Sequence, residues 1–593
     1  MLIISYNHLI SIPEYISTLQ LERLDINRNK LTELQPFIFN LPNLNELNVA
    51  ENFLSRVLIL QTKKSHLKKL NLSNNQLKII PSEISILKDL IYLNLRYNKI
   101  IEFPNILKLT KLRFLSLRLN QISSIPSNIG QLSEIETLDL GYNKLSEIPE
   151  SLNKMKNLKY LGLIANKLNL LPDIFTKLNK LERINISLNN IEFLPESIGN
   201  LINLSNFSSY SNKLTTLPDS LKQLVNLKTL ILRKNKFNTF PMAIFSLKNL
   251  NQLDLKYNRL ETIPRAIKNL TKIKILDLRY NIIKYLPNSL ENLRNLNKFY
   301  LTGNLLSTLP DSLGLMRNLQ SLWLAQNKLT KIPVSVSKLT SLRIIDLSEN
   351  LIRKFPIEIT EISTLKQLYL ANNQITEIDS SIAKLVRLET LDISNNKIKI
   401  LPEILGNLLN IQNLCLKNNT IKTIPKSLKN LKKIRILDIS DNSLSKLDQN
   451  ITDLISLEEL NISKNNLLEI PDSIANLKSL QKLILSKNKI IFLPKAFFKL
   501  ELLDTLDLSF NNLEDLPDDI GKLKNIRILY LNGNKLKTVP KSILNLKKLK
   551  FLYLDNNLFS ENYKKSISGY IRTSNLRTTI ETINAIELML ANS

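Results

Sequence analysis

The stretch LDLRYNIIKYLPNSLENLRNLNK, residues 276–298, decides the fold of this chain because variants of it fill almost the whole sequence. Asn281 marks the unit, and an asparagine stands at the equivalent place 25 times, from Asn7 to Asn557. Neighbouring marker asparagines are 23 residues apart at all but two places, where the spacing is 22. A fixed period of roughly 20 to 50 residues is typical of stacked repeats.

The pattern inside the unit predicts one short strand and one turn. Counted from the asparagine, apolar residues recur at −8, −5, −3, +2, +5, +9 and +12, and proline stands at +6 in 20 of the 25 units. The segment from −6 to −2 alternates as a half-buried strand does. Proline cannot donate a hydrogen bond to a neighbouring strand, so it ends the extended segment.

A unit of this size cannot bury its leucine and isoleucine face alone, whereas stacked units bury one continuous core. We therefore predict an α/β fold, a curved, right-handed solenoid of about 25 repeats. Its parallel β-sheet lies on the concave face, and short 3-10 or irregular turns lie on the convex face. The solenoid is expected to cover residues 1–560, and residues 561–593 are expected to form a C-terminal helical cap.

Both ends of the chain depart from the regular pattern. Repeats near 1–120 are irregular, since residues 53–66 lack the proline signal and the unit from Asn98 to Asn120 is one residue short, so a local change of curvature is expected. At the other end, residues 573–593 carry apolar side chains at helical spacing. We interpret them as a helix over the last core layer; the alternative is an amphipathic helix for a partner. These side chains are Leu576, Ile580, Ile583, Ile586 and Leu590.

The recurring asparagine is interpreted as structural. At the point where the strand turns away, a buried carboxamide can bond backbone groups of its own and the adjacent turn that would otherwise lack partners. The predicted ladder includes Asn98, Asn281, Asn304, Asn327 and Asn350.

The continuation LP-x-x-I-x-x-L, as in LPESIGNL (194–201) and LPDDIGKL (516–523), resembles one class of the leucine-rich repeat family. That class includes plant intracellular Ras-group proteins, Ras-pathway scaffold proteins of animals, repeat domains of plant disease-resistance proteins and many bacterial repeat proteins. The resemblance covers about residues 1–560. It implies a non-enzymatic protein that binds a partner protein on its concave face, each member having its own partner.

The residue content argues against catalysis and against a metal site. The two histidines, His8 and His66, lie in different repeats without a nearby cysteine. Cys415 lies inside a predicted strand with no histidine close enough along the stack to act as its base. No glycine-rich phosphate loop occurs in the sequence. We therefore expect no enzyme activity, cofactor, metal or small-molecule substrate.

The cysteine count, the lack of targeting signals and the net charge restrict the expected compartment and the class of partner. A single cysteine, no recognisable signal peptide and no apolar run of roughly 18 residues favour a cytoplasmic protein, or one exported without a cleavable signal peptide. The net charge of +29 is spread along the chain without a run of five basic residues. It is interpreted as a solvated face, so nucleic acid is not expected as a partner. The oligomeric state is not indicated.

Side chains at −6, −4 and −2 share the open face of the sheet, so deviations in these columns mark candidate binding residues. The predicted concave patch consists of Tyr300, Trp323, Tyr369, Arg233, Lys256, Arg279, Asp254, Asp277 and Asp346. Its three aromatic rings have small neighbours at −2 and are expected to be exposed. Stacking and charge pairing within the sheet, without a ligand, is the alternative. A second, weaker patch is predicted from Tyr92, Arg96, Phe114, Arg118 and Tyr160.

Aromatic and arginine side chains are favoured in the centres of protein interfaces. The leading hypothesis is therefore a scaffold that binds a partner protein on its concave face, with signal transduction or disease-resistance-like recognition as the setting implied by the resemblance. The alternatives are a basic protein that binds polyanions or membrane surfaces, and a pathogen effector that binds host proteins. Steep salt dependence would separate the polyanion binder from the scaffold.

Overall fold

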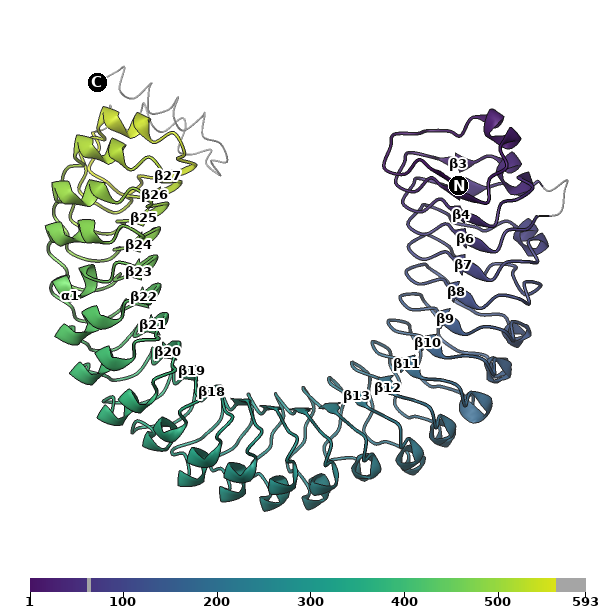
Figure 1. The fold of residues 1–593 in the computed structure, drawn as a ribbon, viewed down its shortest axis with the longest axis horizontal. Helices are drawn as coiled ribbons and strands as arrows, with labels where there is room; N and C mark the ends of the chain where they lie inside the picture. The colour runs from purple at the N-terminus through teal and green to yellow at the C-terminus, as the bar shows by residue number, and fades with distance from the viewer. Residues whose placement is uncertain (61–64, 561–593) are drawn as a thin grey trace. The chain divides into compact units, whose positions relative to one another are not determined.

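The computed structural model describes residues 1–60 and 65–560, drawn as a coloured ribbon in Figure 1. The chain divides into two compact units, Met1–Tyr300 and Leu301–Ser593, and each is described by itself. The helix expected at residues 573–593, and with it the predicted cap at 561–593, lies outside the described residues.

The 25 short strands of the parallel sheet, one for each repeat, are nearly all three residues long. Equivalent residues stand side by side in register, as Leu253 does with Leu276, because every unit has the same length and pattern. In the first unit the strands are β1 (Leu2–Ile3), β2 (Arg23–Asp25), β4 (Glu46–Asn48), β6 (Lys69–Asn71), β7 (Tyr92–Asn94), β8 (Phe114–Ser116), β9 (Thr137–Asp139), β10 (Tyr160–Gly162), β11 (Arg183–Asn185), β12 (Asn206–Ser208), β13 (Thr229–Ile231), β14 (Gln252–Asp254), β15 (Ile275–Asp277) and β16 (Lys298–Tyr300). In the second unit they are β17 (Ser321–Trp323), β18 (Ile344–Asp346), β19 (Gln367–Tyr369), β20 (Thr390–Asp392), β21 (Asn413–Cys415), β22 (Ile436–Asp438), β23 (Glu459–Asn461), β24 (Lys482–Ile484), β25 (Thr505–Asp507), β26 (Ile528–Tyr530) and β27 (Phe551–Tyr553).

Short helices follow most strands, and most of them begin just after the recurring proline. The proline ring holds φ near −65°, and its carbonyl accepts the first bond of the helix, as Pro195 O does from the Ile198 N–H at 3.1 Å. In the first unit the 3-10 helices are η1 (Glu14–Thr18), η2 (Pro36–Asn40), η3 (Ser82–Ile86), η4 (Ile129–Gln131), η5 (Glu150–Lys154), η6 (Phe175–Lys177), η7 (Glu196–Asn200), η8 (Asp219–Gln223), η9 (Met242–Ser246), η10 (Arg265–Asn269) and η11 (Asn288–Asn292). In the second unit the helices are η12 (Asp311–Leu315), η13 (Val334–Lys338), η14 (Ile357–Glu361), η15 (Ser380–Lys384), η16 (Glu403–Asn407), η17 (Lys426–Asn430), the α-helix α1 (Gln449–Thr452), η18 (Asp472–Asn476), η19 (Lys495–Lys499), η20 (Asp518–Lys522) and η21 (Lys541–Asn545).

Within each unit the strands line the inner, concave side and the helices line the outer, convex side (Figure 1). The core lies between them and consists of the repeated leucine and isoleucine columns. In one repeat, for example, Leu253, Leu255, Leu260 and Ile267 are all fully buried. The side chains at −6, −4 and −2 lie on the opposite face of the sheet from this core.

The marker asparagine bonds the backbone of two repeats. The Asn281 carboxamide donates to Leu255 O and Leu278 O at 3.0 Å each, and its Oδ1 accepts the Leu260 N–H at 3.0 Å. Equivalent bonds occur at Asn98, Asn327 and Asn350, and Asn304 donates to Leu301 O at 2.9 Å. The residue before each marker asparagine has a positive φ, 53° at Tyr280.

An additional two-stranded parallel sheet occurs in the irregular region and was not anticipated from the sequence. Strand β3 (Glu33–Leu34) pairs with β5 (Arg56–Val57), and Arg56 contacts Glu33 across the pair at 2.7 Å. Gln35 and Leu58 stand where other repeats have proline. An isolated parallel bridge between Thr262 and Tyr285 occurs at the equivalent place in two repeats that keep the proline, so this kind of pairing does not require its loss.

Candidate binding surface

Six of the predicted patch residues lie on the inner side of the first unit. Three of them end consecutive strands in register, so their side chains point to the same face. The basic residues follow strands β13, β14 and β15 by two positions. The set is Arg233, Asp254, Lys256, Asp277, Arg279 and Tyr300.

Arg279 is held between a carboxylate and a ring. Its guanidinium donates to both Asp277 oxygens at 2.5–3.1 Å and lies 4.6 Å from the centre of the Tyr300 ring. The hydrogen bonds to Asp277 raise the pKa of Arg279 above its usual value. This pairing joins residues two apart in the same repeat and does not cross strands.

Asp254 is buried more deeply than its charge would favour. The residue is 6% exposed, and burial raises its pKa to about 6. Its Oδ1 accepts the Lys256 N–H at 3.0 Å, and the Arg233 guanidinium of the neighbouring repeat lies 3.9 Å from its Oδ2. Here the pairing does cross strands.

Lys256 contacts rings, with no carboxylate within 4.0 Å in the described part of the chain. Its ammonium lies 4.8 Å from the centre of the Tyr257 ring and 5.3 Å from that of Tyr280, and these two rings stack at 4.5 Å with 6° between their planes. Burial, followed by the charge of Arg279, lowers the pKa of Lys256.

Three tyrosines of this surface were missed from the sequence. Tyr257 and Tyr280 stand at −1, a column outside the alternation of the strand. Both residues have a positive φ, and both rings lie beside the Lys256 ammonium. Tyr210 stands at −2, and the Arg233 guanidinium lies 4.6 Å from its ring centre. We call the combined surface the cation–tyrosine patch: Tyr210, Arg233, Asp254, Lys256, Tyr257, Asp277, Arg279, Tyr280 and Tyr300.

The other three predicted residues lie in the second unit, on strands β17, β18 and β19. Trp323, Asp346 and Tyr369 stand in register on these strands. The two rings stack across the intervening aspartate, with their centres 6.4 Å apart and 23° between their planes. Burial raises the pKa of Asp346, and burial and the charge of Asp346 raise the pKa of Tyr369. We call these residues the tryptophan patch.

The expectation that the three rings stand exposed is wrong. Tyr300, Trp323 and Tyr369 are each half-buried. Small neighbours at −2, such as Ala325 and Ala371, leave room for the rings to lean along the sheet instead of standing away from it. Tyr300 and Trp323 belong to different units, so a single patch that includes both stays a prediction.

The second, weaker patch resolves into separate contacts in the first unit. Tyr92 and Phe114 stack at 4.3 Å, and Arg96 lies 5.8 Å from the Tyr97 ring centre. The other predicted members have partners of their own. Arg118 lies 4.5 Å from the Tyr142 ring centre and 3.9 Å from Asp139, and Tyr160 lies beneath Arg183 at 5.4 Å.

Comparison with known proteins identifies the repeat. Leucine-rich repeat models match residues 66–87, 101–189, 225–283, 294–352, 363–406, 455–513 and 501–559. A solved leucine-rich repeat protein of Leptospira interrogans is 30% identical, with a TM-score of 0.52, and the match covers 71% of this chain and 96% of that one. The chain belongs to the leucine-rich repeat proteins.

Plant receptors share the leucine-rich repeat fold over most of the chain. The Arabidopsis receptor kinase HAESA, solved in complex with the peptide hormone IDA and a co-receptor, is 29% identical with a TM-score of 0.57, over 84% of this chain and 83% of that one. An adenylate cyclase of Schizosaccharomyces pombe is 37% identical over 112 residues, which are 19% of this chain and 5% of the cyclase. The leucine-rich repeat fold indicates protein–protein interaction and is typically non-enzymatic.

Reactive groups of this leucine-rich repeat chain are few. Cys415 is half-buried, and burial raises its pKa to about 11, which disfavours the reactive thiolate at neutral pH. Within residues 1–60 and 65–560 there is no group of three or more His, Cys, Asp or Glu side chains that could hold a metal ion. Over the same residues, no helix has the length and apolar character to cross a membrane.

Proposed function

We propose that this leucine-rich repeat protein is a non-enzymatic scaffold that binds a partner protein on its concave face. The observation that carries the proposal is the cation–tyrosine patch, in which four tyrosine rings and three cations lie together on the inner side of the first unit. Tyrosine and arginine are enriched among the residues that dominate binding energy at protein interfaces.

The charge balance of the patch favours a protein over a polyanion. Asp277 neutralises Arg279, and Asp254 lies beside Arg233, so the three cations do not form an uncompensated basic surface. Polyanion binding depends on many free cations that displace counterions. An amphipathic patch of rings with paired charges instead matches the mixed surface of a folded protein or peptide.

The tryptophan patch supplies the corresponding anchor in the second unit. Trp323 is the only tryptophan of the chain and is half-buried against Tyr369, so it presents a rigid apolar surface. Pre-ordered aromatic side chains lose little conformational freedom when a partner covers them. The solved receptor complexes with peptide hormones support a peptide or protein as the ligand class.

Affinity capture with matched variants tests the proposal. We expect Trp323→Ala to lower the affinity for the captured partner by at least about 30-fold, which corresponds to about 2 kcal/mol of binding free energy. Val334→Ala serves as the control, because Val334 is a 72% exposed apolar side chain on the convex helix η13. The same affinity for both variants would remove Trp323 from the binding surface.

The net charge of +29 supports a second candidate, a polyanion- or membrane-surface binder. Heparin binding measured from low to high salt separates the two. A steep loss of affinity with salt, with no sensitivity to Trp323→Ala, would favour the polyanion binder. Weak heparin binding together with loss of partner in Trp323→Ala would favour the scaffold.

A further inference from the structure

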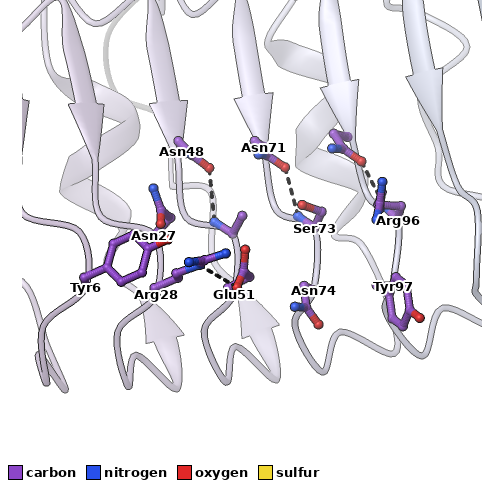
Figure 2. Close-up of a pocket in the computed structure, with 12 residues that line it drawn as sticks. Tyr6, Asn27, Arg28, Asn48, Glu51, Asn71, Ser73, Asn74, Arg96 and Tyr97 are labelled. Carbon is purple, nitrogen blue, oxygen red and sulfur yellow. Dashed lines mark hydrogen bonds and ion pairs between the residues drawn. The ribbon is translucent and has the colours of Figure 1, made fainter. Parts of the chain in front are cut away.

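A hollow of about 470 Å³ lies on the concave side of the first unit, in the first five repeats, away from the cation–tyrosine patch (Figure 2). Its size falls within the usual range of clefts for small ligands, roughly 300 to 1,000 Å³. One rim is the row of residues that precede the marker asparagines, with Tyr6 and Tyr97 at its two ends. The sequence analysis placed only Arg96 of this hollow on a candidate surface.

Three asparagines from neighbouring strands form the floor. Asn48, Asn71 and Asn94 end β4, β6 and β7 in register. Each Oδ1 accepts the backbone N–H two residues further on, at 3.2–3.3 Å. These bonds decide the orientation of the carboxamides, because a flipped amide would set its NH₂ against a backbone N–H. The NH₂ groups of the three asparagines therefore point away from these backbone N–H groups.

Hydrogen-bond donors that are not paired with an acceptor among the described residues lie at the centre of the hollow, on Asn71, and at one end, on Arg96. The Asn48 NH₂ is used by Asp25 at 3.0 Å, whereas the Asn71 NH₂ has no hydrogen-bond partner in the described part of the chain. Arg96 is exposed and, over the same residues, has no carboxylate within 4.0 Å.

The acceptor on the rim is already occupied. Glu51 is neutralised by Arg28, whose Nε lies 2.7 Å from its carboxylate. A group that only accepts hydrogen bonds and carries negative charge therefore complements the position of Asn71 and Arg96.

We propose that this hollow binds the carboxylate of an acidic side chain in an extended peptide segment. The Asn71 NH₂ donates to the carboxylate and the Arg96 guanidinium pairs with it. Tyr6 and Tyr97 are 67% and 50% exposed, and their rings provide apolar surface for the neighbouring residues of the peptide. A polyanion fits less well, because Arg96 is the one lining cation without an acidic partner.

The inference goes beyond the proposed function, because it concerns different repeats and a ligand of defined chemistry. It does not require the patches around Arg279 and Trp323 to bind anything. Loss of binding in Trp323→Ala therefore leaves this proposal untouched. A failure of this proposal likewise leaves the scaffold function standing.

The test uses the full chain and a fluorescein-labelled tetraglutamate peptide, with binding read as fluorescence polarisation. Asn71→Asp is the decisive variant, because it replaces the free donor with an acceptor of the same shape. The fold tolerates aspartate at this position: Asp254, Asp277 and Asp346 accept the equivalent backbone N–H at 3.0–3.1 Å. We expect Asn71→Asp to weaken tetraglutamate binding at least tenfold.

Arg96→Met is expected to weaken binding to a similar extent, and Arg96→Lys by less. Lys108→Met is the matched control, because it removes the same charge from an exposed residue that does not line the hollow. Unchanged affinity in Asn71→Asp, equal binding of tetraglutamine, or no saturable tetraglutamate binding would each overturn the proposal. Heparin that binds more tightly than tetraglutamate, and is weakened by the same variants, would assign the hollow to a polyanion instead.

Discussion

The carboxamide of Asn327 donates a hydrogen bond to Leu301 O, one repeat earlier, at 3.0 Å, and thereby connects neighbouring turns. Its Oδ1 accepts the Leu306 N–H at 3.0 Å, and the residue is 7% exposed. Asn327→Ala leaves buried backbone groups without partners, so we expect it to cost about 1–3 kcal/mol of unfolding free energy in urea denaturation. Gln326→Ala, at the adjacent exposed position, is expected to cost less than about 0.5 kcal/mol. Equal effects of the two variants would contradict the role of the ladder.

Asp254 predicts a local pH dependence of stability. Its pKa is about 6 in the folded chain, compared with 3.8 for an ordinary aspartate. Between about pH 4 and pH 6 the folded chain therefore binds more protons than the unfolded chain does. Stability therefore falls as pH rises from about 4 to about 6, by up to about 3 kcal/mol. Asp254→Asn keeps the bond to the Lys256 N–H and removes the buried charge. We expect it to raise the urea midpoint at pH 7.5 and leave it nearly unchanged at pH 4.

Asp277→Asn is the contrasting variant for this experiment. Asp277 pairs with Arg279 through several short hydrogen bonds, so its removal leaves a half-buried guanidinium without its partner. We expect lower stability at pH 7.5. The two carboxylates are equally buried, at 6% and 7% exposed, so a stabilising effect of Asp277→Asn, or none from Asp254→Asn, would show that the pairing with Arg279 does not distinguish them.

Gly314 in η12 lies where the helices of two neighbouring repeats leave no room for a larger side chain on the convex side. A Cβ at this position would lie 2.0 Å from the backbone oxygen of Ser335 in the next repeat, so the two helices would have to move apart. We expect Gly314→Ala to cost about 1–3 kcal/mol in urea denaturation. Ser312→Ala in the same helix is the control: its buried hydroxyl has no hydrogen-bond partner in the described residues, so its loss is expected to be neutral or stabilising.

Trp323 makes the second unit observable by fluorescence, because the chain has no other tryptophan. Its ring is half-buried and stacks with Tyr369 at 6.4 Å. We expect Tyr369→Ala to expose the indole, which would shift its emission to longer wavelength and increase quenching by acrylamide. Tyr530→Ala removes a ring from a distant stacked pair and is expected to change neither quantity. An unchanged spectrum in Tyr369→Ala would contradict the stacking.

The binding surface could be predicted in part. The columns at −4 and −2 were identified from the alternation of the strand, and this placed Arg233, Asp254 and Arg279 on one face. The stacked rings of Tyr257 and Tyr280 were missed, because residues at −1 adopt a positive φ outside that alternation. The sequence does show a tyrosine at −1 in two consecutive repeats, and this pattern could have indicated the pair. The hollow at Asn71 depends on which amide atom is already bonded, and residue type does not show this.

The sequence by itself determined the repeat, its strand, its turn and the two faces of the solenoid. A period of 23 residues with an asparagine and a proline at constant positions imposes the same backbone on each unit, so local pattern and fold agree. Only the tertiary structure decided which side chains on the concave face contact each other. Strands about 4.8 Å apart let rings and cations lean across one or two neighbours, and no spacing along the chain encodes the direction in which they lean. Trp323 and Tyr369 stack across Asp346 for this reason.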